Sequence, residues 1–118
     1  MSWLDSPLTK NIEHYLDLTN LRENLVVGNL ANIDTPNYHT VDVNFEQELH
    51  QASLGFPAEA SLPRLEEVTG LITRPDGNNV SVDRESMLLS QTQLQFQTGM
   101  SLLKNEFTML EKAITEQP

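Results

Sequence analysis

The chain has 118 residues, with 17 Asp and Glu against 7 Lys and Arg, a formal net charge of -10 and no cysteine. This length fits one small domain, and the negative charge argues against nucleic acid and anionic membrane surfaces as partners. The lack of cysteine excludes disulfides, cysteine nucleophiles and thiolate metal sites.

The start of the chain does not have the pattern of a targeting segment. Residues 1–7 have neither the basic nor the apolar region of a secretory signal peptide, and no apolar run approaches membrane-spanning length. We therefore expect no direct membrane insertion. If the protein leaves the cytoplasm, it must use a route that does not read such a signal.

Residues 7–33 are predicted to form the first helix. Ser6 can cap its start, and Pro7 suits the first helical position. Apolar residues at helical spacing fall on two nearly opposite sides. One side carries Leu8, Ile12, Tyr15, Leu16, Val26, Leu30 and Ile33. The other side carries Leu18, Leu21 and Leu25, so the helix is expected to be covered from two directions.

The helix ends in a motif, NLANIDTPNY, that predicts a rigid corner. Pro36 disfavours helical geometry at Thr35, and Asn37 tolerates a positive φ, so a tight turn is expected here. Asn and Asp side chains of the motif can bond nearby backbone. The candidate residues of this signature turn are Asn29, Ala31, Asn32, Asp34, Thr35, Pro36, Asn37 and Tyr38. From local chemistry alone, an ordinary helix end followed by a loop remains the alternative.

Apolar and polar residues alternate over residues 41–45, as in a short strand or an extended arm. Residues 51–79 differ from both ends of the chain, because Gly and Pro recur there among small residues. We expect this central segment to be extended or partly disordered, with a short strand at residues 68–72 and a turn at residues 76–79. The chain is thus divided into residues 1–50, 51–79 and 80–118.

Residues 83–116 are predicted to form a long helix, capped by Ser81 or Asp83. From Phe96 onward its apolar residues are spaced alternately four and three apart, which is the pattern of a coiled-coil seam. The predicted assembly seam consists of Leu89, Phe96, Met100, Leu103, Phe107, Leu110 and Ile114. Gly99 lies within this pattern at a cost of about 1 kcal/mol relative to Ala, which a close helix contact would explain.

The two terminal helices define the predicted fold class, which is mainly α. They can pair through one apolar stripe each as an α-helical coiled coil, and their remaining stripes would stay exposed in a monomer. Exposed stripes of this kind mark interaction surfaces. The residues alone therefore predict a helical protein that completes its core by assembling with other chains.

No group of residues points to catalysis. His14, His39 and His50 lack zinc-like spacing, and neither a phosphate-binding loop nor a nucleophile motif is present. The carboxylate pairs, such as Asp83 with Glu85, are interpreted as solvated surface, because nothing in the sequence builds a water-excluding pocket around them. We expect no catalytic residues, no metal and no cofactor.

Three stretches of the sequence resemble one family. NLANIDTPNY is similar to the signature of flagellar rod and hook axial proteins, whose common form is approximately A-N-x-x-T-P-G-Y-K. VDVNFEQEL and DGNNVSVDRE resemble proximal-rod proteins of the FlgB type within that family, and the resemblance covers residues 8–49 and 76–114. The chain departs from the family at Asn37, where Gly is common, and at His39, where a basic residue is common.

This resemblance implies a structural subunit of the bacterial flagellar basal body, not an enzyme, that polymerises through its terminal helices in the proximal rod and serves motility. The implied partners are its own copies, other rod proteins, the membrane-proximal rod adaptor and the flagellar type III export apparatus. Export by that route would bring the chain to the periplasm-spanning rod without a cleaved signal peptide. A small helical adaptor or chaperone of the export system remains the alternative.

Overall fold

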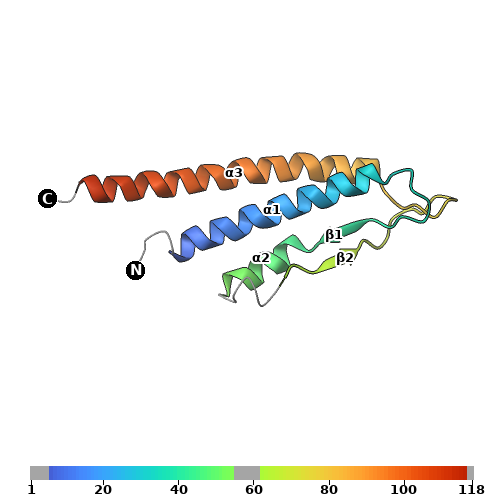
Figure 1. The fold of residues 1–118 in the computed structure, drawn as a ribbon, viewed down its shortest axis with the longest axis horizontal. Helices are drawn as coiled ribbons and strands as arrows, with labels where there is room; N and C mark the ends of the chain where they lie inside the picture. The colour runs from blue at the N-terminus through green and yellow to red at the C-terminus, as the bar shows by residue number, and fades with distance from the viewer. Residues whose placement is uncertain (1–5, 55–61, 117–118) are drawn as a thin grey trace.

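The computed structural model describes residues 6–54 and 62–116, and the chain is an elongated, mainly helical protein (Figure 1). It measures 71 × 28 × 18 Å along its principal axes. In chain order the elements are α1 (Pro7–Ala31), β1 (Val41–Val43), α2 (Phe45–Ser53), β2 (Leu65–Glu67) and α3 (Val82–Thr115). The predicted fold class, mainly α with long terminal helices, is confirmed.

The two long helices lie side by side and run in opposite directions (Figure 1). Both begin where the sequence predicts. Ser6 accepts the N–H of Thr9 at 3.1 Å, with Pro7 in the first turn, and Ser81 accepts the N–H of Arg84 at 3.2 Å. Each hydroxyl satisfies one of the free N–H groups that open a helix. The predicted caps and the pairing of the terminal helices are confirmed.

α1 is covered from two directions, as its two apolar stripes predict. α3 packs along one side, while α2 and β1 cover another (Figure 1). Leu18 of the second stripe is buried, and Leu21 and Leu25 are half-buried. The expectation that α1 leaves an apolar stripe exposed in the monomer is wrong, because the chain's own α2 and β1 fold back onto it.

α2 lies in a region where the residue pattern predicts only an extended arm. β1 occupies Val41–Val43, but the chain then enters α2 at Phe45. Asn44 caps this helix by accepting the N–H of Gln47 at 3.1 Å. Asn followed three residues later by Gln is a signature of a helix start, so the sequence does contain a signal for α2. The helix extends to Ser53, past position 50, where the sequence suggests a boundary.

The interior between these elements is small and rich in polar groups. Its buried apolar side chains are Ile12, Leu18, Val26, Val43, Phe45, Val80 and Leu88. Its buried polar side chains are Thr9, Thr19, Asn29, Thr40, Asp42, Asn78, Asn79, Glu85 and Thr92. Tyr15 packs edge-on against Phe45, with ring centroids 5.6 Å apart, and joins α1 to α2. Because so many polar groups are buried, the fold depends on satisfying their hydrogen bonds.

β1 and β2 form a two-stranded antiparallel ribbon. The strand expected at residues 68–72 does not form there, because β2 ends at Glu67 and the chain continues as irregular, extended backbone. Val68 still donates its N–H to the Thr40 carbonyl at 2.9 Å. The chain thus returns along β1 to the end of α1, where α3 begins (Figure 1).

Gly99 lies where α3 approaches α1 closely. A Cβ at this position would lie 2.6 Å from Cδ2 of Leu16 and 3.1 Å from Cδ1 of Tyr15. Glycine in a helix costs about 1 kcal/mol relative to Ala. The close contact accounts for that cost, and it is the kind of helix contact that explains a glycine within the apolar pattern of α3.

We expect Gly99→Val to lower the free energy of unfolding by roughly 1–3 kcal/mol, because the added side chain must displace Leu16 and Tyr15. Gln97→Val is the matched control. Gln97 is exposed on the same helix, so this change should alter stability by no more than about 0.5 kcal/mol. Urea denaturation measures both values, and equal effects at the two positions would contradict a tight contact at Gly99.

Candidate functional site: the corner and the exposed helical face

The end of α1 is joined to β1 and α3 by one buried amide, the side chain of Asn29. Its Nδ2 donates to the Val41 carbonyl at 2.9 Å and to Oε1 of Glu85 at 3.1 Å. Its Oδ1 accepts the Tyr38 hydroxyl at 2.9 Å and the Val41 N–H at 3.2 Å. The amide thus uses both donor hydrogens and two acceptor sites while Asn29 is 1% exposed. α1, the turn, β1 and α3 all meet at this side chain.

The tight turn after α1 has the geometry that the sequence predicts. Thr35 accepts the N–H of Tyr38 at 3.3 Å across Pro36 and Asn37, and Asn37 has a φ of 63°. Proline in the second position and a positive φ in the third are typical of a type II turn. Asn32 supports it, because its Oδ1 accepts the Thr35 hydroxyl at 3.1 Å while its Nδ2 donates into the last turn of α1.

A second turn, just before α3, locks the first one in place. Asn78 is fully buried, and its Nδ2 donates to the carbonyls of Asn32 and Thr35, each at 2.9 Å. Asn79 accepts the Thr40 N–H at 2.7 Å through its Oδ1. Two consecutive amides from the central part of the chain therefore fix the path of the backbone on both sides of the first turn.

The two turns meet at Asn37 and Gly77, and both residues have a positive φ. The Asn37 N–H donates to the Asp76 carbonyl at 2.9 Å. A Cβ on Gly77 would lie 3.2 Å from Cα of Asn37, so glycine is needed there for space as well as for its backbone conformation. The guanidinium of Arg74 also donates to the Ile33 carbonyl just past α1.

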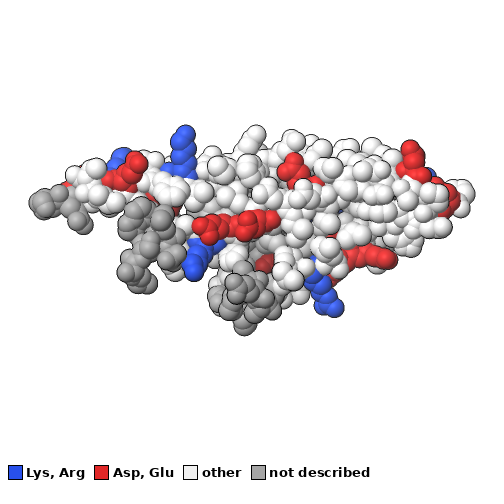
Figure 2. Space-filling model, in the orientation of Figure 1, with Lys and Arg blue, Asp and Glu red and all other residues white. Residues whose placement is uncertain are grey.

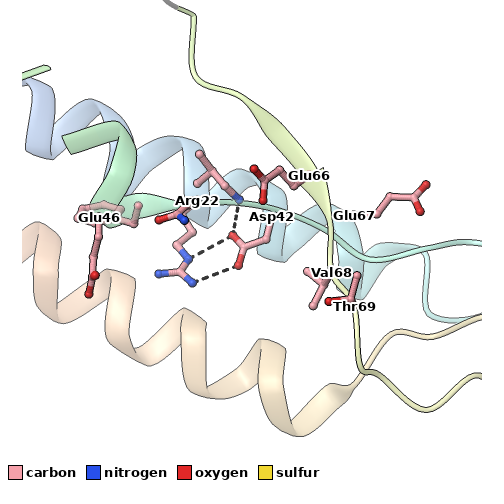
Figure 3. A pocket seen from close by; sticks show the side chains of 10 residues that line it. Arg22, Asp42, Glu46, Glu66, Glu67, Val68 and Thr69 are labelled. Carbon is pink, nitrogen blue, oxygen red and sulfur yellow. Dashed lines mark hydrogen bonds and ion pairs between the residues drawn. The ribbon is translucent and has the colours of Figure 1, made fainter. Parts of the chain in front are cut away.

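Beside Asn29 lies a cluster of two arginines and two carboxylates, part of which Figure 3 shows. Arg22 donates to both oxygens of Asp42, from Nε to Oδ1 at 3.2 Å and from Nη2 to Oδ2 at 3.1 Å. Arg84 donates to Oδ2 of Asp42 at 2.6 Å and to Oε1 of Glu85 at 2.8 Å. The cluster ties α1, β1 and α3 together, and its formal charges cancel.

The two carboxyl groups of this cluster have pKa values shifted in opposite directions. Burial alone would raise the pKa of Asp42, but hydrogen bonds from Arg22, the Val43 N–H and Arg84 outweigh burial and lower that pKa. Burial raises the pKa of Glu85, and the charge of Arg84 opposes this only in part. Glu85 is fully buried, and its Oε2 has no hydrogen-bond partner among the described residues. The interpretation of Glu85 as solvated surface is therefore wrong.

An open hollow lies between this cluster, the start of α2 and the strand β2 (Figure 3). Arg22 and Asp42 line it together with the acidic side chains Glu46, Glu66 and Glu67. Across residues 6–54 and 62–116, no group of three or more His, Asp or Glu side chains is placed to hold a metal ion. The hollow therefore combines the Arg22–Asp42 ion pair with three further acidic residues, over residues that belong to both sides of the β1–β2 ribbon.

The structure brings together most, but not all, of the predicted corner residues. Those that take part in its hydrogen bonds are Asn29, Asn32, Thr35, Asn37 and Tyr38. Ala31 and Pro36 are exposed. Asp34 is exposed too, and its side chain makes no hydrogen bond to another described residue, although it was expected to bond backbone.

The residues that hold the corner in place were not predicted from the sequence. Glu85, Asn78, Asn79 and Arg74 bond the corner or the backbone that flanks it, and Arg22 and Asp42 pair with each other beside it. Asn78 and Asn79 lie in the stretch DGNNVSVDRE, so its resemblance to the family was the available signal. The pairing of Arg22 with Asp42 joins residues 20 positions apart, and no periodicity marks such a contact.

The predicted assembly seam lies beside the line of α3 that packs on α1. That line is formed by the buried residues Glu85, Leu88, Thr92 and Gly99. The exposed members of the seam are Met100, Phe107 and Ile114. Its half-buried members are Leu89, Phe96, Leu103 and Leu110. On the face drawn in Figure 2, charged side chains along α3 gather toward its two ends, and residues 86–103 between them include no charged residue.

Other apolar side chains of α3 are exposed as well: Val82, Met87, Leu94, Leu102 and Met109. A soluble monomer rarely leaves this much apolar surface along one element, and such surface marks a place of interaction. None of the helices in the described parts of the chain is long and apolar enough to cross a membrane.

Known proteins similar to this chain agree with one another, although no protein-family model matches it. The chain is 31% identical to the flagellar basal body rod protein FlgB of Borrelia hermsii, over 79% of this chain and 84% of that protein. It is 30% identical to FlgB of Escherichia coli over 77% and 80% of the two chains. It is 28% identical to FlgB of Bacillus subtilis over 95% and 96%.

The paired terminal helices, the NLANIDTPNY corner and these relatives define a structural protein of the flagellar axial class. Within that class the chain belongs to the FlgB family of flagellar basal body rod proteins. It is a structural subunit of the basal body rod. The same relatives do not favour the alternative, an adaptor or chaperone of the export system.

Asn29→Asp tests the amide at the centre of the corner. It keeps the shape of the side chain but places an oxygen against the Val41 carbonyl and the Glu85 carboxylate. We expect the free energy of unfolding to fall by about 3 kcal/mol or more, the scale for an unpaired buried charge. Tyr38→Phe removes a single hydrogen bond to the same amide and should cost about 1 kcal/mol. Similar losses in urea denaturation would contradict a central role for Asn29.

The pH dependence of stability should separate Asp42 from Glu85. The pKa of Asp42 is lower in the folded protein than in the unfolded chain. Its contribution to the free energy of unfolding is therefore fully present above the unfolded pKa of about 3.9, and it is lost as pH falls through the folded pKa. Glu85 has a raised pKa, so stability is lost as pH rises from its unfolded pKa of about 4.3 through the folded value.

Glu85→Gln removes the second of these effects. Its free energy of unfolding, relative to wild type, should therefore increase as pH rises from about 4 to 8. Urea denaturation at a series of pH values measures this difference. A difference that stays constant across the series would show that Glu85 does not titrate with a raised pKa in the folded protein.

Proposed function

We propose that the chain polymerises with its own copies and with other rod proteins through the apolar side chains of α3. The observation that carries this proposal is the row of exposed seam residues, Met100, Phe107 and Ile114, which the rest of the described chain leaves uncovered. An exposed apolar row favours an interface. The seam's alternating spacing favours a coiled-coil contact with a neighbouring helix.

The reach of α3 beyond α1 supports the same proposal. Two contacts show how far along α3 the start of α1 reaches. Leu16 of α1 lies against the position of Gly99. Nearer the start of α1, Asn11 lines a small apolar hollow together with Leu102 of α3. α1 starts only about one turn before that, at Pro7. The last turns of α3 therefore extend past the start of α1 (Figure 1). In the assembled rod, a helix from a neighbouring subunit would pack against these turns.

The signature turn has a positioning role in this proposal. Hydrogen bonds from Asn29 and Asn78 hold the helix pair and the β1–β2 ribbon in one rigid arrangement. The corner would thus set the angle at which the ribbon faces neighbouring subunits. Ala31, Asp34 and Pro36 are exposed on its outer surface, where such a neighbour can contact them.

Membership of the FlgB family supports finer assignments, which remain part of this proposal. Export by the flagellar type III apparatus, without a cleaved signal peptide, would deliver the chain to the periplasm-spanning proximal rod. There it would contact the membrane-proximal rod adaptor as well as other rod proteins. We assign it no catalytic residue, metal or cofactor, since its role is fulfilled by assembly.

Phe107→Asp tests the seam. Phe107 is 42% exposed in the isolated chain, so the charge should change the free energy of unfolding of the monomer by about 1 kcal/mol or less. In the assembled rod the same charge would be buried without a partner, at a cost of several kcal/mol. We expect the variant to be exported, to be missing from purified basal bodies and to leave the cells non-motile.

Thr108→Asp is the matched control, because Thr108 is exposed next to Phe107 and lies outside the seam. It adds the same charge to the same turn and should leave incorporation and motility intact. Normal motility with Phe107→Asp would overturn the proposal that the seam of α3 is an assembly interface. Loss of motility with both variants would also count against it, because the effect would then be one of charge anywhere on this helix.

A further inference from the structure

The outer edge of β2 carries backbone groups that face away from the ribbon. The Val68 N–H bonds the Thr40 carbonyl at 2.9 Å, which marks a hydrogen-bonded pair of the antiparallel ladder. Such pairs alternate with pairs that are not hydrogen-bonded. Glu66, two residues before Val68, therefore turns its N–H and carbonyl toward β1, whereas Leu65 and Glu67 turn theirs outward.

The two edges of the ribbon differ. On the β1 side, the Asn29 side chain bonds both the N–H and the carbonyl of Val41, so it takes the place of a neighbouring strand. On the β2 side all three residues of the strand are exposed. The outward N–H and carbonyl groups of Leu65 and Glu67 find no hydrogen-bond partner among residues 6–54 and 62–116. The ribbon can thus gain a strand at β2.

The charges beside this edge select the kind of strand. Glu66 and Glu67 are neighbours along β2 and place their carboxylates on opposite faces of the ribbon, while Glu46 lies at the start of α2 (Figure 3). Within the described parts of the chain, Glu46 and Glu66 make no ion pair, and Glu67 reaches only His39, at 3.4 Å. Arg64 precedes the strand but does not balance three carboxylates. A strand that carries Lys or Arg would meet uncompensated negative charge here.

We propose that the outer edge of β2 binds an extended, basic segment of another protein. The segment pairs with Leu65 and Glu67 as a third strand and places a Lys or Arg side chain at the hollow. A second copy of this chain fits poorly, because pairing β2 with β2 sets Glu66 and Glu67 against like charges. With a net charge of -10 on each chain, a basic partner also reduces repulsion between subunits.

The probe is a labelled peptide of about eight residues in which Lys alternates with Val, and its control has Glu in place of Lys. By NMR, the amide protons of Leu65 and Glu67 should exchange quickly in the free protein and slow when the Lys peptide is added. The Glu66 amide already bonds β1 and should change little. Fluorescence anisotropy should show salt-sensitive binding of the Lys peptide and no binding of the Glu peptide.

Variants locate the site. Glu66→Lys should weaken binding of the Lys peptide about tenfold or more. Leu65→Pro removes an outward N–H at an edge position that tolerates proline, and it should abolish binding. Glu13→Lys makes the same charge change at an exposed position of α1 and should leave binding within about twofold. Phe107→Asp should bind as wild type does, which separates this edge from the α3 seam.

Three results would overturn the proposal. The first is equal binding of the Lys and Glu peptides. The second is binding that Glu66→Lys leaves unchanged. The third is slow exchange of the Leu65 and Glu67 amides in the free protein, with concentration-dependent dimers, because the edge would then be occupied by a second copy of the chain.

Discussion

The four hydrogen bonds of the Asn29 amide are the interaction on which the rest of the structure depends. They place the end of α1 against β1 through Val41 and against α3 through Glu85. The buried apolar core alone is small, and hydrophobic contact is not directional. The amide supplies the direction, because its donors and acceptors are satisfied in one arrangement of these elements. The helix pair, the ribbon and the turn are therefore positioned by the same side chain.

The charged cluster next to this amide serves specificity more than stability. The two carboxylates are buried and the two arginines are half-buried. Ion pairs taken out of water in this way gain little over apolar residues of the same volume, whereas breaking one pair is costly. Any slip of β1 against α3 would leave Asp42 or Arg84 without its partner. The protein thus combines a small core and a well-defined corner with a long helix whose apolar side chains face outward. This combination suits a subunit whose shape must be correct before its stability is completed by neighbours.

Sequence patterns predicted those structural features that depend on residues close to one another along the chain. The caps at Ser6 and Ser81, the two helical stripes of α1 and the positive φ of Asn37 depend on local chemistry, and all were predictable. α2 was predictable in principle, but the alternation of residues 41–45 overlaps its cap and favours an arm. The burial of Glu85 was not predictable, because a carboxylate that bonds a residue 56 positions away has the same local pattern as a solvated one.

That separation of 56 residues between Asn29 and Glu85 has a consequence for when the protein can fold. A chain that emerges from a narrow passage with its N-terminus first presents α1 long before the first turn of α3. Until Glu85 follows, the amide lacks one of its partners and the helix lacks α3 along its side. Closing so long a loop costs conformational entropy before any contact repays it. For a chain that emerges in this way, the corner would be completed late, and the rigid subunit would form only after most of the chain is free.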